Sequence, residues 1–334
     1  MKIGKLGFVL GKFYPFHRGH IHLIESAEKQ VEKLIVIVGT LKTENISGEL
    51  RYEWVKETFP HLEVHHLTDD NPQYPQEHPD FWNIWKTSIR KFISEKIDFV
   101  FTSESYGDEL ARNLDAKHIC IDLPRNTFPV SGTAIRENPM KYWDFIAPAA
   151  KPYFVRKIVL YGPESTGKTT LAQQLAKYFQ TNWIPEFARE YLEVKENPML
   201  LEMSDFIRIA EGQIKIEEEA VKFANRILFC DTDLLVTKVL SDHYMNECPE
   251  SITEKAYTRE YSLHLLTYID VPWVADVLRD RPNQREEMFE LFKTELEKTK
   301  RPYKIITGNF EERFQKAVEI IKREILMEDN EREN

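Results

Sequence analysis

The clearest chemical pattern in the sequence is a phosphate-binding motif in its second half. Residues 162–169, GPESTGKT, fit the pattern G-x-x-x-x-G-K-[ST], follow an apolar strand-like segment and open a helical pattern. The backbone N–H groups of such a loop point at phosphate oxygens, and the helix start favours negative charge. We therefore expect an ATP-binding loop in which Lys168 reaches the β- and γ-phosphates. The expected ATP contacts are Gly162, Glu164, Ser165, Thr166, Gly167, Lys168, Thr169 and Thr170.

A carboxylate follows a second apolar segment, as the metal of an ATP site requires. Residues 227–231, ILFCD, end in Asp231, which we expect to hold Mg²⁺ together with the hydroxyl of Thr169. Asp233 comes two residues later, where the N-cap of a helix is an equal alternative to a role in the site. Glu186 and Arg189 follow another short apolar segment. They either bind the phosphoryl acceptor or form a surface pair.

Three arginines cluster in the polar stretch 272–285, PWVADVLRDRPNQR. Enzymes that transfer a phosphoryl group to a small molecule use such cations to close over the reacting groups and exclude water. We expect a lid or acceptor-binding segment that includes Asp276, Arg279 and Arg281. The alternative is a solvated charged loop.

Two histidines stand at the start of the first expected helix. Residues 11–20, GKFYPFHRGH, lie between an apolar strand and a helical pattern. His17 and His20 are three residues apart, so both face one side of the first helical turn, beside a helix start that favours anions. Gly11 and Gly19 permit a close approach of the backbone to a nucleotide. A metal site is the alternative, but no carboxylate or cysteine lies close in sequence.

These motifs sit in two runs of alternating strands and helices, which predict two α/β domains with parallel sheets. We place the boundary near residue 150, after a packed proline-containing segment at 138–152, giving domains 1–150 and 151–334. In the first domain we expect strands at 6–10, 34–38, 64–67, 99–102 and 118–121, and helices at 19–29, 50–59, 81–95 and 106–114. In the second we expect strands at 157–161, 227–230, 265–269 and 303–306, and helices at 168–179, 187–194 and 205–224.

Composition narrows the class of protein. A net charge of −10 over 334 residues argues against a general nucleic-acid binder. The three cysteines form no CxxC pair and indicate reduced thiols, with Cys120 and Cys230 expected in the core. No segment is apolar enough over a sufficient length to cross a bilayer. We expect a cytoplasmic protein with no structural metal, no nucleic-acid partner and no membrane association; a homo-oligomer is left open.

The histidine segment resembles the H-x-G-H signature of the nucleotidyltransferase superfamily, whose second motif is I-S-S-T-x-x-R. Residues 130–136, VSGTAIR, stand in the place of that motif. The resemblance implies a Rossmann-like domain in which His17 and His20 bind ATP and stabilise charge on the α-phosphate. Ser131, Thr133 and Arg136 would grip the departing pyrophosphate, and positioning and electrostatics would supply the catalysis. The implied ATP contacts are Gly11, Phe13, His17, Gly19, His20, Ser131, Thr133 and Arg136.

The two domains in this order resemble the NadR-type enzymes, which join a nicotinamide-nucleotide adenylyltransferase to a P-loop ribosylnicotinamide kinase. Further likeness lies in SESYGDEL at 103–110, EFAREY at 186–191 and PWVAD at 272–276. The resemblance implies that nicotinamide riboside becomes its mononucleotide, NMN, on the second domain and NAD on the first, with one MgATP for each step. It also implies an aromatic partner for the nicotinamide ring, and Trp82 and Trp85 are the candidates.

The resemblance leaves two alternatives open. One is a fusion of phosphopantetheine adenylyltransferase with dephospho-coenzyme A kinase, and the other is a nucleotide-sensing regulator with weak turnover. Some NadR-type proteins begin with a helix-turn-helix domain; because the first motif starts at Gly11, we expect an enzyme without a transcriptional role. The catalytic residues implied are His17, His20, Lys168 and Asp231.

Overall fold

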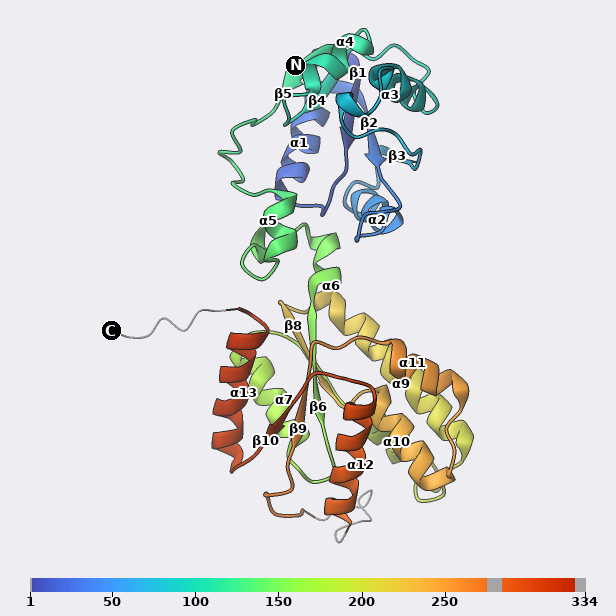
Figure 1. The fold of residues 1–334 in the computed structure, drawn as a ribbon, viewed down its shortest axis with the longest axis vertical. Helices are drawn as coiled ribbons and strands as arrows, with labels where there is room; N and C mark the ends of the chain where they lie inside the picture. The colour runs from blue at the N-terminus through green and yellow to red at the C-terminus, as the bar shows by residue number, and fades with distance from the viewer. Residues whose placement is uncertain (1, 275–283, 328–334) are drawn as a thin grey trace, which may run out of the picture. The chain divides into compact units, whose positions relative to one another are not determined.

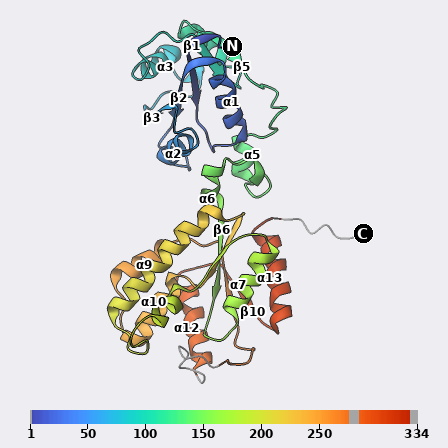
Figure 2. The same ribbon diagram turned by 180° about the vertical axis from the view of Figure 1, so that it is seen from behind.

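The computed structural model describes residues 2–274 and 284–327. The chain forms two compact units, Met1–Tyr153 and Phe154–Asn334 (Figures 1 and 2). Each unit is built on a parallel sheet of five strands, with helices in the connections. The expected α/β class with two parallel sheets is confirmed.

The sheet of the first unit has the strand order β3-β2-β1-β4-β5. The chain moves outward from β1 through β2 to β3, and then crosses to β4 on the other side of β1. The carboxyl ends of β1 and β4 therefore flank the point where strand order reverses, which is where parallel sheets bind ligands. The strands are β1 (Gly4–Gly11), β2 (Val31–Gly39), β3 (Glu63–Leu67), β4 (Phe99–Thr102) and β5 (Lys117–Cys120).

Helices cover both faces of this sheet. Phe8 and Ile35 belong to a buried cluster with Ile89 of α3 and Leu110 of α4, so α3 and α4 cover one face. Right-handed crossovers place α1 and α2 on the opposite face, because their connections run in the opposite direction. The helices are α1 (Arg18–Glu28), α2 (Gly48–Thr58), α3 (Phe81–Arg90), α4 (Gly107–Asn113), α5 (Gly132–Glu137) and α6 (Lys151–Phe154), with short 3₁₀ turns η1 (Pro75–Glu77), η2 (Trp143–Phe145) and η3 (Pro148–Ala150).

Three details of the first unit bear on the sequence predictions. Helix α3 ends at Arg90, before the expected end at residue 95, because the Arg90 guanidinium donates to the carbonyls of Ile93 and Glu95 and stabilises a turn there. Cys120 is exposed, so its expected core position is wrong; it lies at the end of β5, the edge strand of the sheet. The segment after α5 is packed as expected, with Trp143 2% exposed.

The sheet of the second unit has the order β10-β9-β6-β8-β7. Ile158 and Leu160 of β6 pack against α7 and α13, while Val159 and Tyr161 face α9–α12. Figures 1 and 2 show the same division, with α7 and α13 on one side and α9, α10 and α12 on the other. The strands are β6 (Arg156–Tyr161), β7 (Trp183–Ile184), β8 (Ile227–Asp231), β9 (Leu263–Thr267) and β10 (Tyr303–Ile306). The helices are α7 (Lys168–Tyr178), α8 (Phe187–Glu193), α9 (Met203–Ala220), α10 (Leu234–Met245), α11 (Glu250–Thr258), α12 (Arg285–Lys298) and α13 (Phe310–Glu324), with a 3₁₀ turn, η4 (Val221–Phe223).

None of the helices within the described ranges combines the length and the apolar character that a bilayer crossing requires.

Candidate active sites

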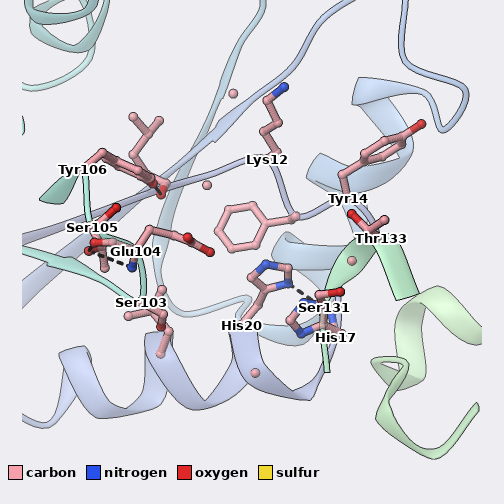
Figure 3. A pocket seen from close by; sticks show the side chains of 18 of the residues that line it. Lys12, Tyr14, His17, His20, Ser103, Glu104, Ser105, Tyr106, Ser131 and Thr133 are labelled. Carbon is pink, nitrogen blue, oxygen red and sulfur yellow. Dashed lines mark hydrogen bonds between the residues drawn. The ribbon is translucent and has the colours of Figure 1, made fainter. Parts of the chain in front are cut away.

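A cavity of about 1000 Å³ opens in the first unit at the carboxyl ends of β1, β2 and β4 (Figure 3). It is lined by the loops that follow β1 and β4, by the start of α1 and by the start of α5. The structure thus brings together every residue that the sequence predicts for ATP or nicotinamide in this unit. They are Gly11, Phe13, His17, Gly19, His20, Trp82, Trp85, Ser131, Thr133 and Arg136.

The two histidines form a stacked pair at the N-terminus of α1. Their ring centroids lie 3.7 Å apart, and the backbone N–H of His17 donates to Nδ1 of His20 over 3.3 Å. His17 is the N-cap of the helix, and it is 7% exposed. Its Nδ1 is buried without a hydrogen-bond partner among the residues the structure describes. One ring nitrogen of the pair therefore has hydrogen-bonding capacity that the described residues do not use.

Burial keeps both imidazoles neutral at pH 7. It lowers the pKa of His17 from 6.5 to about 4, and the positive charge of Arg125 contributes to this shift. The pKa of His20 also lies well below its ordinary value, because of burial first and then the neighbouring His17 and Arg125. Neutral imidazoles can donate N–H hydrogen bonds to phosphate oxygens, and an incoming anion would favour their protonation.

The second motif lies against the loop that carries the histidines. Ser131 is the N-cap of α5, and its hydroxyl accepts from the backbone N–H of Ala134 over 3.1 Å. The guanidinium of Arg136 donates to the Tyr14 carbonyl and, over 3.2 Å, to the Thr133 hydroxyl. A cation, a hydroxyl and a helix start thus converge on the cavity that holds the histidines, which is a suitable setting for a polyphosphate.

The two tryptophans differ in how firmly the protein holds them. The indole N–H of Trp85 donates to the Pro72 carbonyl over 2.8 Å, and its ring lies beside Gly39 at the end of β2. Trp82 is half-buried and packs edge to face against Phe81, with ring centroids 4.9 Å apart. Both rings line the cavity, so stacking of nicotinamide on either one stays a prediction.

Sequence reasoning missed several residues that line the same cavity. Arg125 and Glu104 form an ion pair there, with 2.8 Å between guanidinium nitrogen and carboxylate oxygen. Lys12 and Tyr14 also line the cavity, next to the predicted glycine and histidine residues. Glu104 belongs to the segment 103–110, whose only signal in the sequence is its likeness to the NadR-type enzymes. Arg125 belongs to no motif, and its only signal is a basic residue between β5 and the second motif.

In the second unit, the loop 162–169 has the backbone of a phosphate cradle. Gly162 and Gly167 have φ values of 134° and 81°, in the region that favours glycine. The ammonium group of Lys168 bends back over the loop and donates to the carbonyls of Gly162 and Pro163 over 2.9 and 2.8 Å. The lysine thus lies over the space that its loop encloses, where phosphates bind in such loops.

A hydroxyl and a carboxylate meet beside this loop. The Thr169 hydroxyl donates to Oδ2 of Asp231 over 2.5 Å, while Oδ1 is buried and makes no hydrogen bond within the described part of the chain. Burial raises the pKa of Asp231, and the charge of Lys168 opposes the shift. An unsatisfied buried carboxylate oxygen beside a hydroxyl is a donor set that suits Mg²⁺. The residues therefore fit the metal that the motif implies.

The other predicted members of the loop have different surroundings. The Thr166 hydroxyl is buried and shared with the Pro163 carbonyl and the Thr267 hydroxyl, so it ties the loop to β9. The hydroxyl of Ser165 accepts from the backbone N–H of Val274 over 2.8 Å. Glu164 is half-buried and Thr170 is exposed on the first turn of α7.

Asp233 is the N-cap of α10, which is the alternative that the sequence offers to a role in the binding site. Its Oδ1 accepts from the backbone N–H groups of Leu235 and Val236, and its Oδ2 lies 3.0 Å from Nε2 of His264. The side chain is buried, so the structure accounts for both of its oxygens. A role for Asp233 in binding a riboside stays a prediction.

The remaining described candidates belong to α8 and to the start of α12. Arg189 lies on α8, and its positive charge acts on the pKa of Asp231. Glu186 directly precedes the same helix as its N-cap. Arg285 donates to the carbonyl of Ser165 over 3.1 Å, so it supports the cradle from outside. Asp276, Arg279 and Arg281 lie outside the described residues.

Comparison with known proteins assigns each unit to a fold and the chain to a family. A family model described as cytidylyltransferase-like matches residues 8–138, and one described as an AAA domain matches residues 157–313. The trifunctional NAD biosynthesis/regulator protein NadR of Escherichia coli is 32% identical over 340 residues, covering 95% of this chain and 82% of that protein. The chain belongs to the NadR family.

Further members of the NadR family agree with this assignment. NadR of Salmonella typhimurium is 32% identical over 345 residues, again covering 95% of this chain and 82% of that protein. Crystal structures of NadR in complex with NR, and with NAD and AMP-PNP, superpose with TM-scores of 0.80 and 0.79 at 22% identity and cover 97% of this chain. The fold predicted for both domains is therefore confirmed across nearly the whole chain.

Proposed function

We propose that this chain is a bifunctional enzyme of NAD synthesis, with a ribosylnicotinamide kinase in residues 151–334 and a nicotinamide-nucleotide adenylyltransferase in residues 1–150. The kinase converts nicotinamide riboside and ATP to NMN, and the adenylyltransferase converts NMN and ATP to NAD and pyrophosphate. One observation carries the proposal: each unit of this NadR-family chain has its own phosphate-binding architecture at the carboxyl ends of a parallel sheet. A kinase that makes a 5′-monophosphate supplies an adenylyltransferase that consumes one.

In the first unit, His17 and His20 bind the α-phosphate of ATP through imidazole N–H groups. The phosphate of NMN attacks the α-phosphorus, the bond to the β-phosphate oxygen breaks, and pyrophosphate leaves. Negative charge grows on the α-phosphate oxygens during this step, and the buried histidine pair stabilises it in a site of low dielectric constant. Ser131, Thr133 and Arg136 bind the β- and γ-phosphates and hold the leaving group in line.

In the second unit, the loop 162–169 binds the triphosphate through its N–H groups. Lys168 exchanges its two carbonyl partners for the β- and γ-phosphates, which compete strongly for a cation. Thr169 and Asp231 would hold Mg²⁺, which neutralises charge on the phosphates when bound. Arg189 of α8 acts through its positive charge on Asp231, which supports a role for it in binding the phosphoryl group or the acceptor.

Two alternatives remain to be tested by substrate. A phosphopantetheine adenylyltransferase joined to a dephospho-coenzyme A kinase has the same order of fold types, but membership of the NadR family favours nicotinamide substrates. A nucleotide-sensing regulator would bind the same ligands and turn them over slowly.

Substrate choice by the wild-type chain tests the proposal. The protein is incubated with MgATP and nicotinamide riboside, NMN or phosphopantetheine, and the products are separated by liquid chromatography. We expect NMN followed by NAD from the riboside, NAD and pyrophosphate from NMN, and no dephospho-coenzyme A. Formation of dephospho-coenzyme A would support the first alternative. Fewer turnovers than one per chain, with retention on DNA at physiological salt, would support the second.

A further inference from the structure

Tyr14 contacts the cation of the second motif, although the sequence pattern assigns Tyr14 itself no role. The guanidinium carbon of Arg136 lies 4.1 Å from the centroid of the Tyr14 ring, and the same guanidinium donates to the Tyr14 carbonyl. Figure 3 shows the Tyr14 ring at the end of the cavity where Thr133 lies, and Thr133 accepts the other hydrogen bond of Arg136. The ring face and the carbonyl of one residue thus hold one guanidinium.

A second arginine contacts the same ring but differs in its charge balance. Arg51 of α2 lies 5.0 Å from the ring centroid and is fully buried. Its guanidinium pairs with the carboxylate of Glu44 and donates to the Lys12 carbonyl over 2.8 Å. Arg136 is exposed, and its hydrogen-bond partners among the described residues are neutral. The charge of Arg51 is therefore neutralised by Glu44, and Arg51 serves the structure of the unit. The charge of Arg136 stays available to an anion in the cavity.

The backbone on both sides fixes Tyr14 itself. The phenol oxygen accepts from the backbone N–H of Asn45 over 3.1 Å, which ties the residue to the loop before α2. On the side of α5, a Cβ atom added to Gly132 would lie 2.2 Å from the Tyr14 carbonyl oxygen. Only glycine allows this contact, so the backbone at the first turn of α5 lies in close contact with the Tyr14 carbonyl. Three segments of the first unit therefore meet at this residue.

We propose that Tyr14 is a positioning residue of the adenylyl-transfer site, which holds the Arg136 guanidinium in place for the pyrophosphate portion of ATP before the nucleotide binds. The proposal rests on the function proposed above for the first unit. A guanidinium on a flexible side chain loses rotamer freedom when it binds an anion, and an arginine already held by a ring and a carbonyl loses less. Removal of the ring should therefore weaken the binding of ATP more than it slows the bound reaction.

A double-mutant cycle between Tyr14 and Arg136 tests this coupling. For NAD formation from NMN, we expect Tyr14→Leu to raise the KM for ATP about 10-fold with a smaller change in kcat, and Tyr14→Phe to recover most of the loss. When Arg136 is already methionine, Tyr14→Leu should add less than about 2-fold, because its action passes through the missing guanidinium. Equal effects of Tyr14→Leu in both backgrounds would overturn the proposal. Phosphorylation of nicotinamide riboside by the second unit is the internal control in each variant.

Gly132→Ala provides a second route if the leucine variant does not fold. It leaves the ring in place but pushes the start of α5 away from the Tyr14 carbonyl, so we expect a similar rise in KM for ATP. An unchanged KM in a folded Gly132→Ala chain would contradict the proposal.

A measurement of binding separates this proposal from the function it rests on. Calorimetry with inorganic pyrophosphate, on chains that also carry Lys168→Ala to weaken the other site, should show the same non-additive cycle. If the wild-type chain makes no NAD from NMN, the adenylyltransferase function proposed for the first unit is wrong. The double-mutant cycle measured by pyrophosphate affinity then still decides whether Tyr14 positions Arg136.

Discussion

The neutral state of His17 leads to a quantitative prediction for acid stability. Its pKa is about 4 in the folded chain and 6.5 when exposed, so the unfolded state takes up the proton first as the pH falls. The free energy of unfolding therefore has its full value above pH 6.5, and it decreases as the pH falls toward 4. The full effect is about 3 kcal/mol, of which about 2 kcal/mol is lost by pH 5. Replacement of His17 by asparagine removes this titration and keeps a side chain suited to the N-cap.

Hydrogen exchange can measure this effect in the first unit alone. Val9 and Val36 lie fully buried in the central strands β1 and β2, and their amides report the opening of that unit. We expect the free energy of opening to fall between pH 7.5 and pH 5 by about 2 kcal/mol more in the wild type than in His17→Asn. The matched control is in the same sample, since Val159 and Leu265 are buried in the sheet of the second unit. Their exchange should respond to pH identically in both proteins.

One result would refute this reasoning. If Val9 and Val36 lose the same free energy of opening in wild type and variant, His17 titrates alike in the folded and unfolded chain. The conclusion that burial keeps His17 neutral at pH 7 would then be wrong.

Three further changes have separate expected outcomes. Thr169→Val removes the hydroxyl beside the Asp231 carboxylate, and it should lower kcat for riboside phosphorylation on the order of 100-fold. NAD formation from NMN should be unchanged in the same assay. Gly167→Ala places a side chain at φ 81° and 2.8 Å from Phe310, so chemical denaturation of the second unit should show a loss of about 1–2 kcal/mol, together with weaker ATP binding. Trp82→Ala should raise the KM for NMN about 10-fold. Trp85→Ala should in addition destabilise the first unit by about 3 kcal/mol, more than Trp82→Ala does, because the Trp85 indole is also hydrogen-bonded.

Local patterns in the sequence were sufficient to predict where the candidate phosphate-binding groups lie. A motif such as residues 162–169 specifies a strand, a loop and a helix within a few residues, so its geometry follows from its own sequence. The convergence of His17 with Ser131 was also predictable, because loops at the carboxyl ends of parallel strands meet at one edge of the sheet. The assignment of these residues to catalysis stays a prediction.

Features that depend on contacts distant in sequence could not be predicted. Tyr14 acquires its surroundings from α2 and α5, and nothing near it in sequence indicates two arginines. Asp233 satisfies equally the pattern of a helix cap and that of a site carboxylate, and only its buried contact with His264 accounts for its second oxygen. The exposure of Cys120 likewise follows from the edge position of β5, because strand order is not encoded in the local pattern.

The most direct test of two separate active sites uses one inactivating change in each unit. Lys168→Ala should abolish the conversion of nicotinamide riboside to NMN and leave NAD formation from supplied NMN nearly intact. His20→Ala should accumulate NMN from the riboside and make little NAD, and a mixture of the two variants should restore NAD formation. If either change stops both reactions in a folded chain, the two activities share one site and the account is contradicted.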